Sequence, residues 1–175
     1  MNLEFGKIPG VFIVTPEPVN DERGFFARLY CKDDLAAAGI SFTPAQINLC
    51  RNIRRHTLRG LHYQDSPYGE AKLVSVTHGA VYDVVVDLRP NSAWYGRWEA
   101  FELDGESARA LFIPAGCAHG YLTLLPHTDV LYHMDRKHVV GRAKGYRWND
   151  PTFNIPWPME PAVLSTADRS WPDFR

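Results

Sequence analysis

The sequence predicts an all-β fold, either a sandwich or a barrel. Short runs of β-branched and aromatic residues recur along the chain, and Gly, Pro, Asn and Asp separate them. Many short strands at even spacing are typical of both architectures. The length of 175 residues fits one domain, 1–175, and is sufficient to bury about two-thirds of the surface of the unfolded chain. A single compact core is therefore expected.

The expected strands cover residues 11–14, 24–30, 58–64, 73–77, 81–88, 97–103, 110–113, 121–124 and 130–133. His78-Gly79 and Asp104-Gly105 are predicted to be tight hairpin turns. Residues 33–39 have an acidic start and a glycine stop, which predicts a helix of one to two turns. From Gly141 onward the chain is rich in Pro, Trp and charged residues, and we expect a tail packed on the sheets.

Composition excludes several functional classes. The 19 Lys and Arg residues against 20 Asp and Glu residues give a net charge of -1, which argues against nucleic-acid or membrane-surface partners held by overall charge. Any anionic ligand must then meet a local cluster of cations. The three cysteines form no CxxC pair, so neither a disulfide framework nor a zinc knuckle is expected. With no leader-like segment and no apolar run approaching about 18 residues, the protein is predicted to be soluble and cytoplasmic.

A histidine and a lysine frame a turn-forming segment in the middle of the chain. His62 lies within one strand-like run, Lys72 opens the next, and the turn-forming residues 65–70 lie between the two runs. If the two runs fold back symmetrically about Pro67, then residues 62 and 72 become cross-strand neighbours on one face. This geometry predicts a base beside a cation; the alternative is a surface hairpin that exposes both side chains.

Residues 114–120 give the pattern Pro-x-Gly-x-x-His after an expected strand, a turn that would project His119 into a barrel mouth. The pattern resembles the second motif of the cupin jelly rolls. The first cupin motif supplies two histidines and a glutamate in metal-binding members, whereas this chain has His62, Gln64 and Glu70 there. The metal set is incomplete, so no bound metal is expected, and His119 is interpreted as a hydrogen-bond donor.

Over nearly its whole length the chain also resembles the dTDP-4-dehydrorhamnose 3,5-epimerase family. The resemblance lies in the order and spacing of sequence blocks at residues 21–26, 46–48, 58–64, 72, 79–89, 114–120, 131–132, 147–151, 155–158, 164–165 and 168. It implies a cupin-type double-stranded β-helix, or jelly roll, with short helices and a packed C-terminal tail. It also implies a nucleotide-diphospho-4-keto-6-deoxyhexose substrate, whose C4 ketone acidifies the hydrogens on C3 and C5.

The resemblance implies four catalytic residues. His62 would remove a proton, and Asp168 would hold its tautomer and stabilise its charged form. Lys72 would stabilise the oxyanion that develops at C4. Tyr132 would deliver a proton to the opposite face of the sugar, because a base that returns its own proton only restores the original centre. Such an enzyme needs no cofactor.

The resemblance also implies substrate-binding residues. Arg23, Arg59 and His119 would meet the pyrophosphate, to which arginine makes bidentate contacts, and Phe26 would stack on the base. The family's segment around residues 23–28 reaches the site of a neighbouring subunit, so a homodimer is implied. The remaining expected contacts to the substrate are Gln46, Asn48 and His138. The nearby cluster of Arg51, Arg54 and Arg55 is assigned to a loop without a functional role.

The chain departs from the family pattern at several positions. Arg28 replaces a glutamate that would accept the N3 hydrogen of thymine, and a guanidinium only donates. Cytosine offers acceptors, so CDP is an alternative to dTDP, unless Arg28 faces solvent or a phosphate. After Tyr132 the chain has residues 133–138 without the further tyrosines of the family, which either restricts the reaction to one centre or admits a different sugar. Cys50 replaces a serine and is expected to pack.

Three functions therefore follow from the sequence. The leading one is a cofactor-independent epimerase that inverts C3, C5 or both in deoxysugar or O-antigen biosynthesis. The second is a metal-dependent cupin enzyme that acts on another small molecule. The third is an idle sugar-nucleotide binding protein, against which the set of His62, Lys72, Tyr132 and Asp168 argues.

Overall fold

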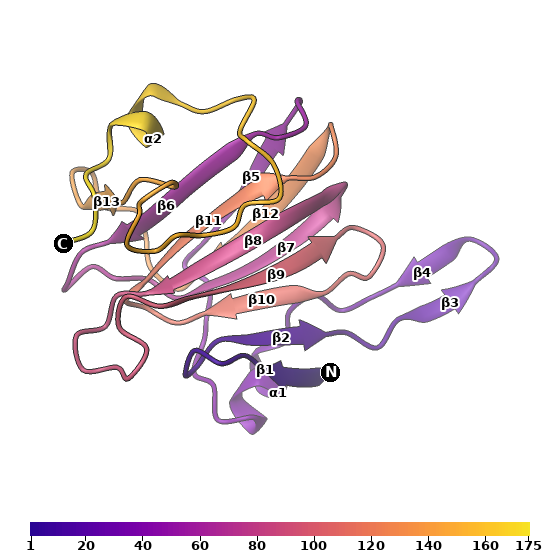
Figure 1. Cartoon of the computed structure of the whole chain (residues 1–175). Coiled ribbons are helices and arrows are strands. Elements are labelled where there is room, and N and C mark those ends of the chain that lie inside the picture. The colour runs from indigo at the N-terminus through magenta and orange to yellow at the C-terminus, as the bar shows by residue number, and fades with distance from the viewer.

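The computed structural model describes residues 1–175 as two antiparallel sheets that face each other, with an arm and two short helices outside them (Figure 1). The six-stranded sheet has the order β1 (Asn2–Phe5), β2 (Phe12–Thr15), β10 (Ala110–Ile113), β7 (Lys72–His78), β12 (Thr128–Met134) and β5 (Gln46–Asn52). The five-stranded sheet has the order β13 (Ala143–Gly145), β6 (Leu58–Gln64), β11 (Cys117–Thr123), β8 (Ala80–Asp87) and β9 (Trp98–Asp104). From β9 onward successive strands alternate between the two sheets, as in a cupin-type jelly roll.

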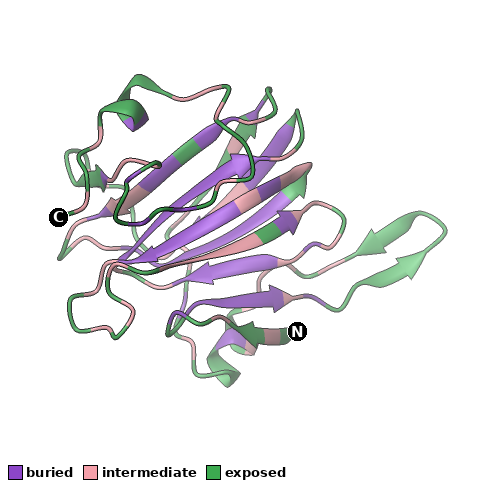
Figure 2. Ribbon diagram, in the orientation of Figure 1, coloured by how far each residue is buried: buried purple, intermediate pink, exposed green.

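The core lies between the two sheets, where the β-branched residues of both inner faces meet. The main cluster includes Val74 and Val76 from β7, Val85 from β8, and Leu111 from β10, all nearly inaccessible to solvent. Figure 2 shows the same division, with buried residues on the central strands and exposed residues at the periphery. Burying one such side chain contributes roughly 1.5–3 kcal/mol, so these strands hold the cavity described below in place.

The expected strands at 58–64 and 110–113 have the observed bounds of β6 and β10, and the helix expected at 33–39 is α1 (Lys32–Ala37). Three expectations were wrong in extent or type. The run at 24–30 is a strand only over β4 (Gly24–Phe26), and His119 lies within β11 rather than in a turn. Arg51 belongs to β5 and pairs with Asp129, so it is not part of a loop.

The expected hairpins were wrong, because each connection crosses from one sheet to the other. His78-Gly79 joins β7 to β8, and Asp104-Gly105 joins β9 to β10, and in both cases the two strands belong to different sheets. The symmetric hairpin about Pro67 fails for the same reason. His62 and Lys72 are therefore not cross-strand neighbours; they approach each other across the gap between the sheets.

Two segments lie outside the sandwich. The arm, formed by β3 (Val19–Asp21) and β4, projects from the body with every residue exposed (Figures 1 and 2). The C-terminal tail carries α2 (Thr166–Ser170) and packs on the five-stranded sheet as predicted, with Phe153 and Ile155 buried against that sheet. No helix is long and apolar enough to cross a membrane.

Candidate active site

A cavity of about 360 Å³ opens between the two sheets at one end of the sandwich. Most of the predicted site residues line it, although they come from five strands and one loop: Asn48, Arg59, His62, Lys72, His119, Tyr132 and His138. Gln46 lies at its edge, where its side-chain oxygen accepts a hydrogen bond from the backbone of His138 at 2.9 Å. Asp168 lies behind His62. The cavity thus collects side chains that are far apart in the sequence.

The strand register explains why His62 and Arg59 share the cavity. On β6 they stand three positions apart along a strand whose side chains should alternate, which would place them on opposite faces. The pairing of β11 with β6 shifts between His119 and Tyr121, so His119 lies opposite His62 and Tyr121 opposite Arg59. Gly60 permits this shift, because a Cβ atom there would lie 2.5 Å from the Cα of Gly120.

His62 and Asp168 form a hydrogen-bonded pair at the cavity wall. His62 Nε2 lies 2.5 Å from Asp168 Oδ1, and this contact leaves Nδ1 as the ring nitrogen without a carboxylate partner. The side chain of His62 is 43% exposed, whereas that of Asp168 is 6% exposed. A half-exposed imidazole beside a shielded carboxylate has the arrangement of a general base and its orienting group.

Helix α2 places Asp168 beneath His62. Ser165 caps the helix by accepting the backbone N–H of Asp168 at 3.0 Å, and the indole Nε1 of Trp171 donates to Asp168 Oδ1 at 3.2 Å. Burial alone would raise the pKa of Asp168. The hydrogen bond and charge of His62, with the contacts from Ser165 and Trp171, outweigh burial and hold the pKa below its usual value.

A second histidine and aspartate pair lies deeper in the sandwich. His119 Nε2 contacts both carboxylate oxygens of Asp83 at 2.9 Å, and both side chains are buried. Burial raises the pKa of Asp83, opposed by the contacts from His119 and the charge of Lys72. This pair fixes the ring orientation of His119 in the cavity wall.

Lys72 enters the cavity from the first position of β7. Its ammonium lies 3.3 Å from a carboxylate oxygen of Glu70 and donates to the backbone carbonyl of His62 at 3.4 Å. The ammonium is therefore held beside β6, the strand that carries His62, and it lies where a negative charge developing in the cavity would be stabilised.

Tyr132 projects into the cavity from the six-stranded sheet, on the other side from β6. Burial raises the pKa of its phenol well above the usual value, so the hydroxyl keeps its proton at neutral pH. Its ring packs edge-on against His119, with the ring centroids 5.9 Å apart. A protonated phenol in this position has the character of a proton donor.

Arg59 has no carboxylate partner, although it lines the cavity. Its Nε donates to the side-chain oxygen of Asn52 at 2.8 Å, and Asn52 in turn bonds the hydroxyl of Tyr121. The neutral partners leave the positive charge of the guanidinium uncompensated, which suits an anionic ligand. Cys50 packs beside this network, as predicted, and receives a hydrogen bond from Tyr121.

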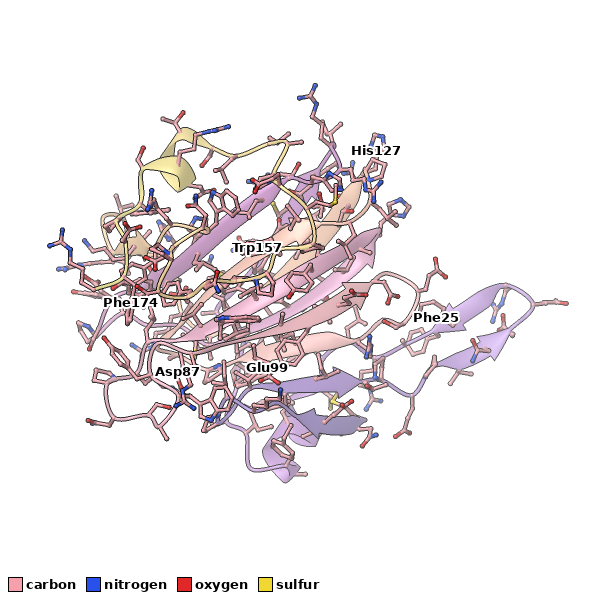
Figure 3. All side chains as sticks on the ribbon, viewed as in Figure 1. Phe25, Asp87, Glu99, His127, Trp157 and Phe174 are labelled. Atoms are coloured by element: carbon pink, nitrogen blue, oxygen red, sulfur yellow. The ribbon has the colours of Figure 1, made fainter.

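The arm residues expected to bind substrate lie away from this cavity. Arg23 pairs with Asp21 within the arm, and Phe26 is 76% exposed. Arg28 lies 3.6 Å from Asp34 of α1, so it faces a carboxylate rather than the cavity of its own chain. Figure 3 shows the neighbouring Phe25 on the same projecting arm, whereas Trp157 of the tail lies over the five-stranded sheet.

The donor set does not fit a metal ion. No group of three or more His, Cys, Asp or Glu side chains is positioned to hold one. Gln64 donates a hydrogen bond to Glu70, and the ammonium of Lys72 lies beside the same carboxylate. A positive charge within contact distance of the only glutamate in the cavity disfavours a cation there.

Sequence reasoning missed Asp83, Trp171 and the structural role of Glu70. Two signals were available. Asp83 is a carboxylate inside an apolar run, which is rarely buried unless it is paired. Ser165 and Asp168 stand three apart, the spacing of a helix-capping box, which would have indicated α2.

Comparisons with known proteins match the same family along nearly the whole chain. A family model for dTDP-4-dehydrorhamnose 3,5-epimerase matches residues 6–175. The dTDP-4-dehydrorhamnose 3,5-epimerase of Methanothermobacter thermautotrophicus is 37% identical over 173 residues, which cover 97% of this chain and 92% of the relative. The dTDP-4-dehydrorhamnose 3-epimerase of Streptomyces niveus is 38% identical over 163 residues, covering 93% of this chain and 78% of the relative.

A solved structure of the same family has nearly the same fold as this chain. The crystal structure of dTDP-4-dehydrorhamnose 3,5-epimerase from Bacillus anthracis, with TDP and PPi bound, has a TM-score of 0.96 to this chain at 36% identity and covers 99% of both chains. The matches span the strands, the cavity and the tail that carries Asp168. The chain belongs to the dTDP-4-dehydrorhamnose 3,5-epimerase family.

Proposed function

We propose that this protein is a cofactor-independent epimerase that inverts C3, C5 or both in a nucleotide-diphospho-4-keto-6-deoxyhexose. The observation that carries the proposal is the His62–Asp168 pair, which shares one cavity with the ammonium of Lys72 and the phenol of Tyr132. Together these groups supply a base, an oxyanion stabiliser and an acid. Epimerisation next to a ketone needs these three functions and no redox step.

The reaction begins with proton removal. His62 takes the hydrogen from the carbon next to the C4 ketone, and Asp168 stabilises the imidazolium that forms. The electron pair moves onto the C4 oxygen to give an enolate. Lys72 stabilises that oxygen, a contribution of roughly 3–4 kcal/mol in preorganised sites.

Inversion requires a second proton source on the other face of the sugar. Tyr132 comes from the opposite sheet to His62, and its raised pKa keeps it protonated until the enolate forms. Transfer of its proton to the carbon from that face yields the inverted centre. The carbonyl is regenerated, and solvent exchange restores the protonation states of His62 and Tyr132.

The nucleotide end of the substrate is assigned from charge. Arg59 lacks a carboxylate partner in the cavity and is the proposed contact for the pyrophosphate, with His119 beside it. The Bacillus anthracis relative was solved with TDP and PPi bound, which supports a thymidine diphosphate. CDP is the alternative nucleotide, because the guanidinium of Arg28 can donate hydrogen bonds to the acceptors of cytosine.

We further propose a homodimer in which the arm reaches the cavity of the partner subunit. The arm leaves Val19 67% exposed, Phe25 49% exposed and Phe26 76% exposed, although aromatic and aliphatic side chains favour burial. Phe26 would then stack on the base in the partner's cavity, with Arg23 near the pyrophosphate. The enzyme would act in the cytoplasm, in deoxysugar biosynthesis.

Solvent exchange tests the proposed function. The protein is incubated in deuterium oxide with the 4-keto-6-deoxyglucose derivatives of dTDP and CDP in separate samples, and the C3 and C5 proton signals are followed by NMR. Loss of one or both signals is expected, and the signal lost identifies the centre. No exchange with either nucleotide would overturn the proposal.

The metal-dependent alternative is not favoured. The glutamate that a metal would need already contacts Lys72 and Gln64. Exchange that persists at the wild-type rate after dialysis against a chelator is the expected result.

A further inference from the structure

Glu70 is a buried carboxylate in the cavity wall that the proposed mechanism does not use. It lies in the segment between β6 and β7 and is only 6% exposed. Ionised side chains are seldom buried unless they are paired. The contacts of Glu70 can either satisfy only its own charge or also fix the position of the Lys72 ammonium.

The contacts of Lys72 indicate that its ammonium is held in a fixed position. An ammonium has three N–H donors and no acceptor. One donor faces Glu70 Oε1 at 3.3 Å, and another is given to the carbonyl of His62 at 3.4 Å. Contacts to two fixed acceptors define the position of this long, flexible side chain. The third N–H donor of the ammonium remains for a ligand in the cavity that Lys72 lines.

The carboxylate of Glu70 is itself fixed from behind. Gln64 donates from Nε2 to Glu70 Oε2 and to the carbonyl of Tyr68 at 3.3 Å, so both of its N–H donors are used. The side-chain oxygen of Gln64 accepts the backbone N–H of Val139 at 2.7 Å. The contacts therefore form a series that runs from the backbone of Val139, after β12, through Gln64 and Glu70 to the ammonium of Lys72. Each polar group in this series has a defined orientation.

The charge of Glu70 is required by this arrangement as well as its shape. Both neighbours, Lys72 and Gln64, present donors, and a carboxylate has an acceptor on each oxygen. A glutamine at position 70 has one acceptor oxygen and one NH₂ group, so one neighbour would face a donor. An amide of the same size therefore cannot satisfy both contacts.

We propose that Glu70 is a positioning residue for the epimerisation, which holds the ammonium of Lys72 at the place where the C4 oxygen becomes negative, and that Gln64 holds Glu70. The inference rests on the proposed function, because it assigns Lys72 to the enolate oxygen. In this role Glu70 takes no part in the proton transfers. It acts only through Lys72.

The first test is Glu70→Gln, measured by the deuterium exchange described above at several substrate concentrations. The substrate is whichever of the two nucleotide derivatives the wild-type protein exchanges. A displaced catalytic group costs up to about a hundredfold, and we expect kcat to fall by about ten- to a hundredfold with KM changed by less than about twofold. Glu106→Gln is the matched control, because Glu106 is exposed and lies outside this cavity.

A double-mutant cycle with Lys72→Met separates positioning from general damage. If Glu70 acts through Lys72, then adding Glu70→Gln to Lys72→Met leaves the residual exchange rate unchanged. If both substitutions reduce the rate independently, Glu70 has another role and the proposal is wrong. Wild-type kcat in Glu70→Gln alone would also overturn it.

Gln64→Met provides the same test if Glu70→Gln does not fold. It keeps the Glu70–Lys72 pair and removes the amide behind it, and we expect kcat to fall by about threefold, again with no further loss in the Lys72→Met background. An unchanged kcat would contradict the role of Gln64. Absence of exchange in the wild-type protein would refute the proposed function instead, so the two failures are distinguishable.

Discussion

The histidines of the two histidine and aspartate pairs lie on the neighbouring strands β6 and β11, yet their surroundings give the pairs different properties. His62 is half exposed and is paired with Asp168 from α2 in the C-terminal tail. His119 is buried and is paired with Asp83 from the adjacent strand of the same sheet. The pKa of Asp168 is lowered and that of Asp83 is raised. The same two residue types thus form a pair with an accessible imidazole in one place and a fully buried pair in the other.

The largest expected effect comes from removing the base of the exposed pair. His62→Ala should reduce solvent exchange by about 10²–10⁴-fold, the usual contribution of a general base. His78→Ala is the control, because His78 is exposed at the other end of β7. A His62→Ala protein that exchanges the substrate hydrogens at the wild-type rate would show that the base lies elsewhere.

Asp168→Asn should have a smaller effect on the rate. The amide keeps the size of the carboxylate but loses the charge that stabilises the imidazolium, and it no longer fixes the tautomer. We expect kcat to fall by about ten- to a hundredfold, with circular dichroism unchanged. If Asp168→Asn matched the wild-type kcat, then Asp168 would be a structural partner of His62 only.

Asp83→Asn should affect stability more than rate. Asp83 accepts from His119 with both oxygens, and an asparagine turns one of these acceptors into a donor that faces the ring nitrogen. We expect a loss of about 1–3 kcal/mol in the free energy of unfolding, measured by urea denaturation. A larger loss of kcat than in Asp168→Asn, at full folding, would reverse the roles assigned to the two pairs.

The smallest expected effect is the pH dependence of stability. The lowered pKa of Asp168 means that its contribution is present above the unfolded value of about 3.9 and is lost as the pH falls through the folded value. For Asp83 the raised pKa gives the opposite sign: its contribution is present below about 3.9 and is lost as the pH rises through the folded value. Urea unfolding of the wild type and of each Asn variant across pH 3–7 measures both slopes, and slopes of equal sign would contradict this distinction.

Local patterns were enough to predict the strands that pack in the core. Short β-branched and aromatic runs separated by Gly, Pro, Asn and Asp predicted β6 and β10 with their observed bounds. They did not predict β5, in which Asn48 lines the cavity, Gln46 lies at its edge and Asn52 bonds to Arg59, so polar residues occupy positions that would be apolar in a core strand. For this reason, sequence patterns assign a strand that lines a polar site to a loop.

Sheet assignment could not be predicted from short turns. His62 and Lys72 do approach each other, but through the gap between the sheets, because the segment between them changes sheet instead of forming a hairpin. Whether a turn reverses a strand or transfers it depends on the pairing of distant strands such as β11 and β12. The partnership of Asp168 with His62 came only from the family resemblance, since 106 positions separate the two residues.

The location of Asp168 in the tail also sets the order in which the site is completed. Chains are synthesised from the N-terminus and fold as their segments emerge. A nascent chain that has already paired β6 with β11 still has no carboxylate beside His62, because α2 follows every strand in the sequence. A partly synthesised chain can therefore hold paired strands without Asp168, and the His62–Asp168 pair forms only after every strand has been translated.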